Sequence, residues 1–484
     1  MAATEHGRDM RTCRELSKQL AAANLSAPFL DKPPRLIGAG SYNDVFLIRY
    51  DSQAIVLRLS YYSPYTLSKV QGLIRQHLPY KQLLSKAHLV TAQDPVMVKN
   101  NYSRFCNMLI EHGVCPHFVY MFHQKDVKCF AALVRDQVKR ERQRNNLSFR
   151  YNNVSFHEKF QTSLRLKLRQ LTDLQLTVAV FHVLYALAVL QHYLPDFRHN
   201  DLSLDNILVT LVASGAAAAK YDHYRIGGTD FWVPDAGILT AVTDFDLAHA
   251  CMTVAPVAAC GGKAERPYTL LNQLIVKDQF GNHSDAQARN INGTPNKAFD
   301  TYYFLFRLKE ALGSRPSEVQ RWLAAHEVMH KSGKNKYIAQ PYPTLYPNVL
   351  LANAPIFAKF RQGPRAPPDP RQHPYTFKPL PALMTSGEHL KDAAMASDLL
   401  GLVLECLPPA LRMQPRQAGN LVRGIRLDLY CSMARRRRRR RPSWVQQLLL
   451  AASSGQQRRH SWVQRKAASP VTPSRSGRQR RFSY

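Results

Sequence analysis

A polar loop at residues 199–208 contains the residue types that phosphoryl transfer requires. It reads His-Asn-Asp-Leu-Ser-Leu-Asp-Asn-Ile-Leu, so that Asp201 and Asn206 are five residues apart. Transfer of a phosphoryl group from ATP needs a carboxylate that orients the acceptor hydroxyl and an amide oxygen that holds magnesium. We therefore predict Asp201 as the catalytic base and Asn206 as a ligand of Mg²⁺. Ordinary turns have a similar composition, so this loop needs support from elsewhere in the chain.

A second acidic motif, Asp244-Phe245-Asp246, lies further along the chain. It follows the apolar pair Ala241-Val242. A carboxylate directly after a buried strand can bind the metal that bridges the ATP phosphates. We predict Asp244 as this second metal ligand, with Phe245 packed beneath it.

Two features near the N-terminus could contact the nucleotide itself. The segment from Gly38 to Val45 has the pattern G-x-G-x-x-x-x-V, and its glycines Gly38 and Gly40 would let backbone N–H groups approach phosphate oxygens. Arg58, on an apolar run at 54–59, would then pair with the α- and β-phosphates. Taken singly, a glycine pair between strands is an ordinary turn, and an arginine on a strand is an ordinary surface residue.

These residues need a sheet before the polar loop and a buried helix leading into it. β-like runs at 35–38, 45–50 and 54–59 predict the sheet. Thr172 and Gln175 form a capping-box pattern that opens an apolar helix to about Tyr193. Further helices are predicted at 67–85, 102–110, 299–312, 317–329 and 393–407.

The order of these features, and the residues between 181 and 208, resemble a known family. Three segments look like the catalytic core of Ser/Thr protein kinases of iridovirus-like large DNA viruses, namely Phe181–Leu187, Phe197–Leu202 and Asn206–Leu208. The resemblance covers roughly residues 35–312. It implies an α+β, bilobal, protein-kinase-like fold, with ATP and Mg²⁺ as cofactors and proteins as substrates. It also implies that His199 supports the backbone of residues 244–246 and that Asp300 braces the polar loop.

Several positions depart from the family pattern. Arg58 stands where the family has a lysine on the strand. Asn43 replaces the third glycine of the loop, and Asp246 replaces the glycine that follows Asp-Phe. The strand cation usually has an acidic partner on a helix, and Glu111 is the predicted partner here. These departures leave two alternatives open, a small-molecule kinase of the aminoglycoside or choline type and a pseudokinase scaffold that binds polyanions.

The charge of the chain is concentrated at its end. Of the formal net charge of +32, residues 434–484 contribute 15 Lys and Arg with no Asp or Glu. Such a segment cannot bury a core and attracts nucleic acid or other polyanions. The predicted domains are an N-terminal extension (1–34), a kinase N-lobe (35–135), a C-lobe with insertions (136–433) and a disordered Arg-rich tail (434–484).

The remaining composition predicts an intracellular protein. The eight cysteines include no Cys-x-x-Cys pair, which is typical of a reducing compartment. Residues 1–23 lack the apolar stretch of a signal peptide, and the longest apolar run, 176–190, is too short to span a bilayer. We expect no transmembrane segment and a location in a host nucleus or cytoplasm, with association with a virus particle left open.

Overall fold

The computed structural model describes the chain at residues 8–23, 34–39, 43–62, 64–128 with short gaps, 151–194, 197–212, 221–248, 297–326, 342–363 and 375–376. The chain divides into two compact units, Met1–Arg412 and Met413–Tyr484. The described residues all belong to the first unit. The predicted helix at 393–407 and the predicted Arg-rich tail therefore lie outside the described residues.

A five-stranded sheet contains the predicted N-terminal strands. Its order is β1-β2-β3-β5-β4. The members are β1 (Arg35–Ala39), β2 (Asn43–Tyr50), β3 (Gln53–Tyr61), β4 (Met121–Lys128) and β5 (Tyr151–His157). The first three confirm the strands predicted from the sequence. Strand β5 lies beyond residue 135, where the N-lobe was expected to end, yet it pairs with both β3 and β4.

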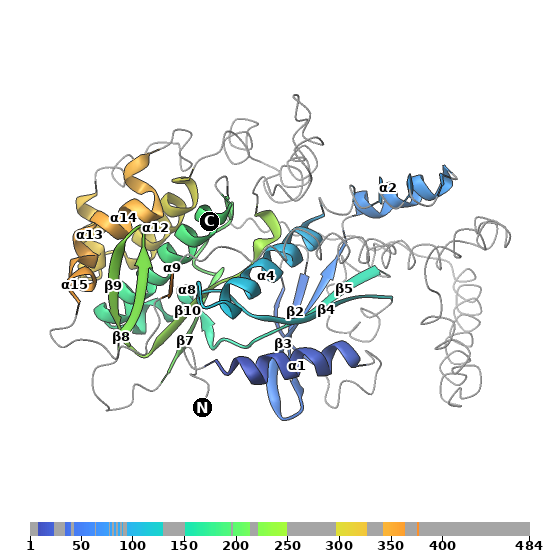
Figure 1. Cartoon of the computed structure of the whole chain (residues 1–484), viewed down its shortest axis with the longest axis horizontal. Coiled ribbons are helices and arrows are strands. Elements are labelled where there is room, and N and C mark those ends of the chain that lie inside the picture. Colours follow the sequence, from blue (N-terminus) through green and yellow to red (C-terminus); the bar gives the residue numbers. More distant parts are fainter. Residues whose placement is uncertain are drawn as a thin grey trace, which may run out of the picture. The chain divides into compact units, whose positions relative to one another are not determined.

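One face of this sheet is apolar and is covered by helix α1 (Met10–Ala22), which packs along it in Figure 1. Leu16 and Leu20 of α1 join a buried cluster with alternate residues of the sheet. These alternate residues are Phe46, Ile48, Ile55, Leu57, Leu59, Tyr61, Val154 and Phe156. Because side chains alternate along a strand, the residues between them project from the other face.

That other face is polar and lies against helix α4 (Pro95–Glu111). The Lys99 ammonium of α4 donates to the Ser60 hydroxyl of β3, and the Asn100 amide donates to Asn153 of β5 at 3.0 Å. The helix begins earlier than the predicted 102–110, because Asp94 caps it by accepting a hydrogen bond from the backbone N–H of Val96. A shorter helix, α2 (Pro64–Arg75), precedes it.

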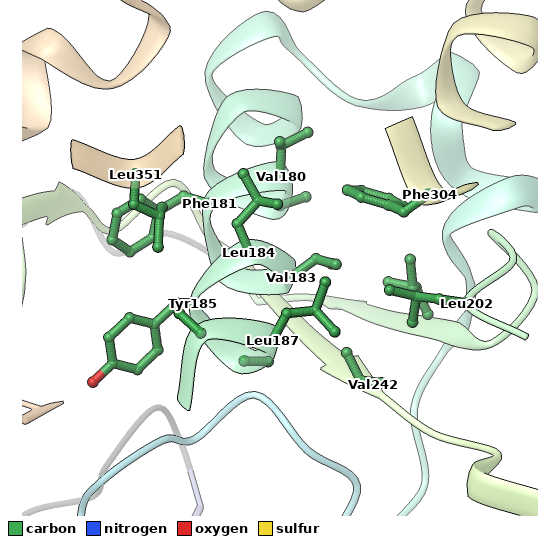
Figure 2. Close-up of a cluster of buried hydrophobic side chains, with 14 of the residues drawn as sticks. Val180, Phe181, Val183, Leu184, Tyr185, Leu187, Leu202, Val242, Phe304 and Leu351 are labelled. Atoms are coloured by element: carbon green, nitrogen blue, oxygen red, sulfur yellow. The ribbon is translucent and has the colours of Figure 1, made fainter. Parts of the chain in front are cut away.

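Helix α9 (Asp173–Tyr193) forms the centre of the second core. The predicted capping box is present, with Thr172 and Gln175 each bonding the other's backbone N–H. Figure 2 shows side chains of α9 packed against Leu202, Val242, Phe304 and Leu351 from other elements. By length and hydropathy this helix could cross a membrane, but 83% of its apolar window is buried inside the protein. It therefore resembles the core helix of a globular protein, as the sequence predicted.

The elements around α9 complete the described part of the chain. A three-stranded sheet has the order β10-β7-β6, with β6 (Thr162–Ser163), β7 (Ile207–Leu211) and β10 (Ile238–Val242). Between β7 and β10 the chain forms a hairpin of β8 (Tyr221–Ile226) and β9 (Thr229–Pro234), which β11 (Tyr375–Thr376) extends. The helices are α8 (Leu164–Lys167), α12 (Phe299–Leu312), α13 (Glu318–Ala325), α14 (Pro347–Asn353) and α15 (Ala358–Gln362), with 3₁₀ turns η3 (Leu168–Gln170), η4 (Phe245–Leu247), η7 (Pro343–Leu345) and η8 (Pro355–Phe357).

Candidate active site

The polar loop, residues 199–206, joins the region after α9 to strand β7. Within it the Asn206 amide donates to the Asp201 carboxylate at 3.0 Å and to the Asp201 backbone carbonyl at 2.7 Å. The loop therefore holds the two predicted catalytic residues against each other. Burial, reinforced by the charge of Asp244, raises the pKa of Asp201 to about 7. A carboxylate with a pKa close to neutral is well suited to general base catalysis.

Two buried side chains hold the backbone of this loop in place. Asp300, in the first turn of α12, accepts hydrogen bonds from the backbone N–H groups of His199 and Asn200 at 2.6 and 2.9 Å. His199 donates from Nε2 to the carbonyl of Thr243 at 2.9 Å, and burial lowers its pKa, which favours the neutral ring. These contacts are the bracing roles that the family resemblance implied for His199 and Asp300.

The acidic segment, residues 244–246, follows β10 directly beside the polar loop. The backbone N–H of Thr243 donates to the Asn206 carbonyl at 3.0 Å, which places the two segments side by side. Asp244 has a positive φ of 71°, a left-handed conformation that is unfavourable for residues other than glycine and is often found at functional sites. Phe245 is buried and stacks on Tyr102 of α4, with ring centroids 5.9 Å apart. The segment is thereby packed against α4.

Arg58 forms an ion pair with Asp244, at 2.8 Å between Nη2 and Oδ1. The predicted pairing of Arg58 with Glu111 is wrong. Glu111 is the last residue of α4, and its carboxylate accepts the Tyr120 hydroxyl at 2.5 Å. The part of α4 that approaches β3 is instead its second turn, where the chain has Lys99.

Three further residues lie in this site, of which the sequence marked Asn43 and Asp246 only as departures from the family pattern and Lys99 not at all. Lys99 is 1% exposed, and its ammonium experiences the charges of Asp246, Arg58 and Asp244. Asp246 is also buried, and it accepts a hydrogen bond from the Asn43 amide at 3.2 Å. The available signal was the pattern itself, since both Asn43 and Asp246 replace family glycines and a lysine occurs in an otherwise weakly charged helix.

The glycine segment is only partly described. Gly38 pairs with Val45 across β1 and β2, and Val45 faces Arg58 across β2 and β3. A Cβ atom on Gly38 would meet the Val45 side chain at 3.8 Å, which is an ordinary contact. The structure thus brings Gly38, Val45 and Arg58 together, whereas Gly40 lies outside the described residues.

The chemistry of these side chains is suited to a divalent cation bound with phosphates. Asp246 Oδ1 is buried without a hydrogen-bond partner. In the described ranges, no group of three or more His, Cys, Asp or Glu side chains is arranged to hold a metal alone. Mg²⁺ is usually bound by one or two carboxylates plus substrate phosphates, so Asp244 and the amide oxygen of Asn206 would be its protein ligands.

Comparison with known proteins gives local similarity. No protein-family profile matches the chain. It is 37% identical over 73 residues to "Putative serine/threonine-protein kinase R400" of Acanthamoeba polyphaga mimivirus, a match that covers 15% of this chain and 16% of that protein. A solved structure described as the kinase domain of PF14_0431 aligns over 58% of this chain and 65% of that chain, at 12% identity and a TM-score of 0.28.

The mimivirus match supports a protein-kinase-like relationship for this chain. The mixed helix-and-sheet architecture, with its five-stranded sheet, is consistent with that class. The chain spans about 16% of the length of this relative.

Proposed function

We propose that this protein transfers the γ-phosphate of ATP, with Mg²⁺, to Ser or Thr hydroxyls of proteins. The observation that carries the proposal is the pairing of Asp201 with Asn206 in a loop braced by Asp300, directly beside Asp244. Each of these residues was predicted from the sequence, and their proximity to one another supports the proposal.

The protein's contribution to the reaction is positioning and charge. Asp201 would accept a hydrogen bond from the incoming hydroxyl, while the Asn206 amide fixes the direction of the carboxylate. Arg58 pairs with Asp244 in this structure, so its guanidinium would turn from the carboxylate to the phosphates when nucleotide binds. Mg²⁺, when bound, would stabilise the negative charge that develops on the phosphates.

The first prediction concerns Asp201→Asn, which keeps the size of the side chain and removes the base. We expect phosphate transfer to a mixed protein substrate to fall by about 10²-fold or more, since general base catalysis contributes on the order of 10²–10⁴. The measurement is incorporation of labelled γ-phosphate. The matched control is Asp205→Asn in the same loop, whose carboxylate is 55% exposed and pairs with Arg165. We expect it to retain activity within about threefold, because surface ion pairs contribute little.

The pseudokinase scaffold remains a second candidate because of one contact. The Arg58–Asp244 ion pair places a cation on the carboxylate that Mg²⁺ would need. If the wild-type protein neither transfers phosphate nor gains thermal stability with ATP and Mg²⁺, the scaffold is the better account. If ATP stabilises the protein but no protein substrate is labelled, the small-molecule kinase is the better account.

A further inference from the structure

We propose that Lys99, on helix α4, is a phosphate-binding residue that acts together with Arg58 on the bound nucleotide. This inference rests on the proposed function and adds to it a residue that no family pattern assigns. It follows from the position of Lys99, from the charges around it and from the contacts of its neighbours.

Lys99 reaches from α4 to the strand that contains Arg58. Its ammonium donates to the hydroxyl of Ser60, which lies two residues after Arg58 on β3 and therefore on the same face of the sheet. Val45, across the strand pair from Arg58, borders the same face. A lysine that starts from α4 thus brings its charge to the region where the strand cation lies.

Lys99 and Arg58 are two cations with little solvent exposure, and their charges must be balanced. Lys99 is 1% exposed and Arg58 has a side-chain exposure of 12%, so the site places two cations close together with little water. Buried charges are stable only with counter-charges. In this structure the counter-charges are Asp244, which pairs with Arg58, and Asp246, whose charge acts on both Lys99 and Arg58.

Nucleotide binding with Mg²⁺ would change this balance between the two cations and their carboxylates. Asp244 is the predicted metal ligand, and a carboxylate that faces a divalent cation no longer neutralises a neighbouring guanidinium. The two cations then need another anion, and the α- and β-phosphates of the nucleotide supply it. Lysine is a common phosphate binder, because its ammonium has three donors on a flexible stem. Lys99 can therefore turn from Ser60 to a phosphate oxygen without movement of the helix.

A simpler role for Lys99 would be to neutralise Asp246, and the two roles differ in their consequences. If Lys99 only balanced Asp246, removing both charges together would restore the site. If Lys99 binds phosphate, removing Asp246 as well would leave the affinity for phosphorylated nucleotides low. Adenosine has no phosphate, so its affinity reports on the rest of the nucleotide pocket.

The experiment measures the binding of ATP, ADP and adenosine by calorimetry, with Mg²⁺, to the full chain and to Lys99→Met. We expect the affinity of Lys99→Met for ATP and ADP to fall at least tenfold and its affinity for adenosine to stay within twofold. The double variant Lys99→Met with Asp246→Asn should remain at least tenfold weaker for ATP. Lys18→Met, which removes a lysine on α1 with a side-chain exposure of 77%, is the matched control and should bind like the wild type.

Other outcomes would overturn the inference in distinguishable ways. Wild-type affinity of Lys99→Met for ATP, or recovery in the double variant, would refute phosphate binding by Lys99 and leave the proposed function intact. A wild-type chain that binds neither ATP nor ADP would refute the proposed function itself. If Lys99→Met fails to fold, Lys99→Gln serves instead, since its amide can still donate to Ser60 without a charge.

Discussion

Two carboxylates on the β8–β9 hairpin have pKa values that are shifted in opposite directions. Burial, together with the charge of Asp235, raises the pKa of Asp222 to about 7. Asp230 accepts hydrogen bonds from Arg225, which together with His223 lowers its pKa. The fold therefore favours the protonated form of Asp222 and the ionised form of Asp230.

The pH dependence of stability should show this difference. A raised pKa in the folded state stabilises the fold fully below the unfolded value near 4, and this contribution is lost as pH rises through about 7. Asp222→Asn lacks that loss, so we expect it to be more stable than the wild type by on the order of 1 kcal/mol at pH 8, with little gain at pH 4. Urea unfolding at pH 4, 6 and 8 measures the difference.

Asp230→Asn is the control for this prediction, because the pKa of Asp230 is shifted in the opposite direction. A lowered pKa in the folded state stabilises the fold at pH values above the pKa of the unfolded state. This stabilisation is lost as the pH falls through the pKa of the folded state. This variant should therefore be less stable than the wild type at pH 8 and similar to it at low pH. A pH-independent effect of Asp222→Asn would contradict the assigned cause.

At single positions, the sequence predicted the residues that follow a local pattern and missed those that depend on a distant partner. Asp201, Asn206 and Asp244 were found because they occur in short motifs. The approach of Lys99 to the strand of Arg58 was not predicted, because Glu111 and Lys99 lie on the same helix and only the angle of α4 against β3 decides which of them approaches. Such an angle depends on packing over the whole sheet and leaves no local signal.

Among the elements, α1 has a role that its sequence only partly indicated. The sequence placed residues 1–34 in an extension outside the two lobes, whereas α1 within this extension covers the apolar face of the sheet. Arg8, just before it, is anchored by Glu158, at 2.7 and 2.8 Å, and donates to the Phe118 carbonyl at 2.7 Å. Residues 8–22 are therefore part of the folded unit.

Leu16→Ala tests this contribution of α1. Leu16 is 3% exposed within the sheet cluster, and truncation of a buried leucine typically costs about 2–4 kcal/mol of unfolding free energy. We expect a loss in that range by urea denaturation. Lys18→Ala, at an exposed position of the same helix, should change the stability by less than about 0.5 kcal/mol. A loss below that limit for Leu16→Ala would show that α1 does not stabilise the sheet in solution.

The limits of element prediction have a similar physical origin. Strands β1 to β3 and helix α9 were predicted because hydrophobic alternation, turns and caps are local. Strand β5 was not predicted, because only Val154 and Phe156 mark its apolar face, while Asn153, Ser155 and His157 face the polar side of the sheet. Two apolar positions are too few to establish a strand from alternation alone.

At the scale of the whole molecule, the distribution of charge is the strongest remaining signal. The predicted tail has 15 basic residues and no acidic ones, including seven consecutive arginines at 435–441. We expect the full chain to bind a short DNA duplex without sequence preference, with an affinity that falls about 10³-fold or more between 50 and 200 mM salt. A chain ending at Met433 should bind at least tenfold more weakly and show a smaller salt dependence. Fluorescence anisotropy measures both, and equal binding by the two chains would assign the interaction to the folded unit.

The pairing order of the five-stranded sheet has a consequence for synthesis of the protein. Strand β3 pairs with β5, and α1 packs on a face that β5 completes, so residues near 20 and 60 must wait for residue 157. At about 5–20 residues per second on the ribosome, that delay is about 5–20 s for residue 60 and about 7–27 s for residue 20. During it Phe46, Leu57 and Leu59 would be exposed on an incomplete sheet. The nascent chain is therefore a candidate client for chaperones that shield apolar strands until translation has passed β5.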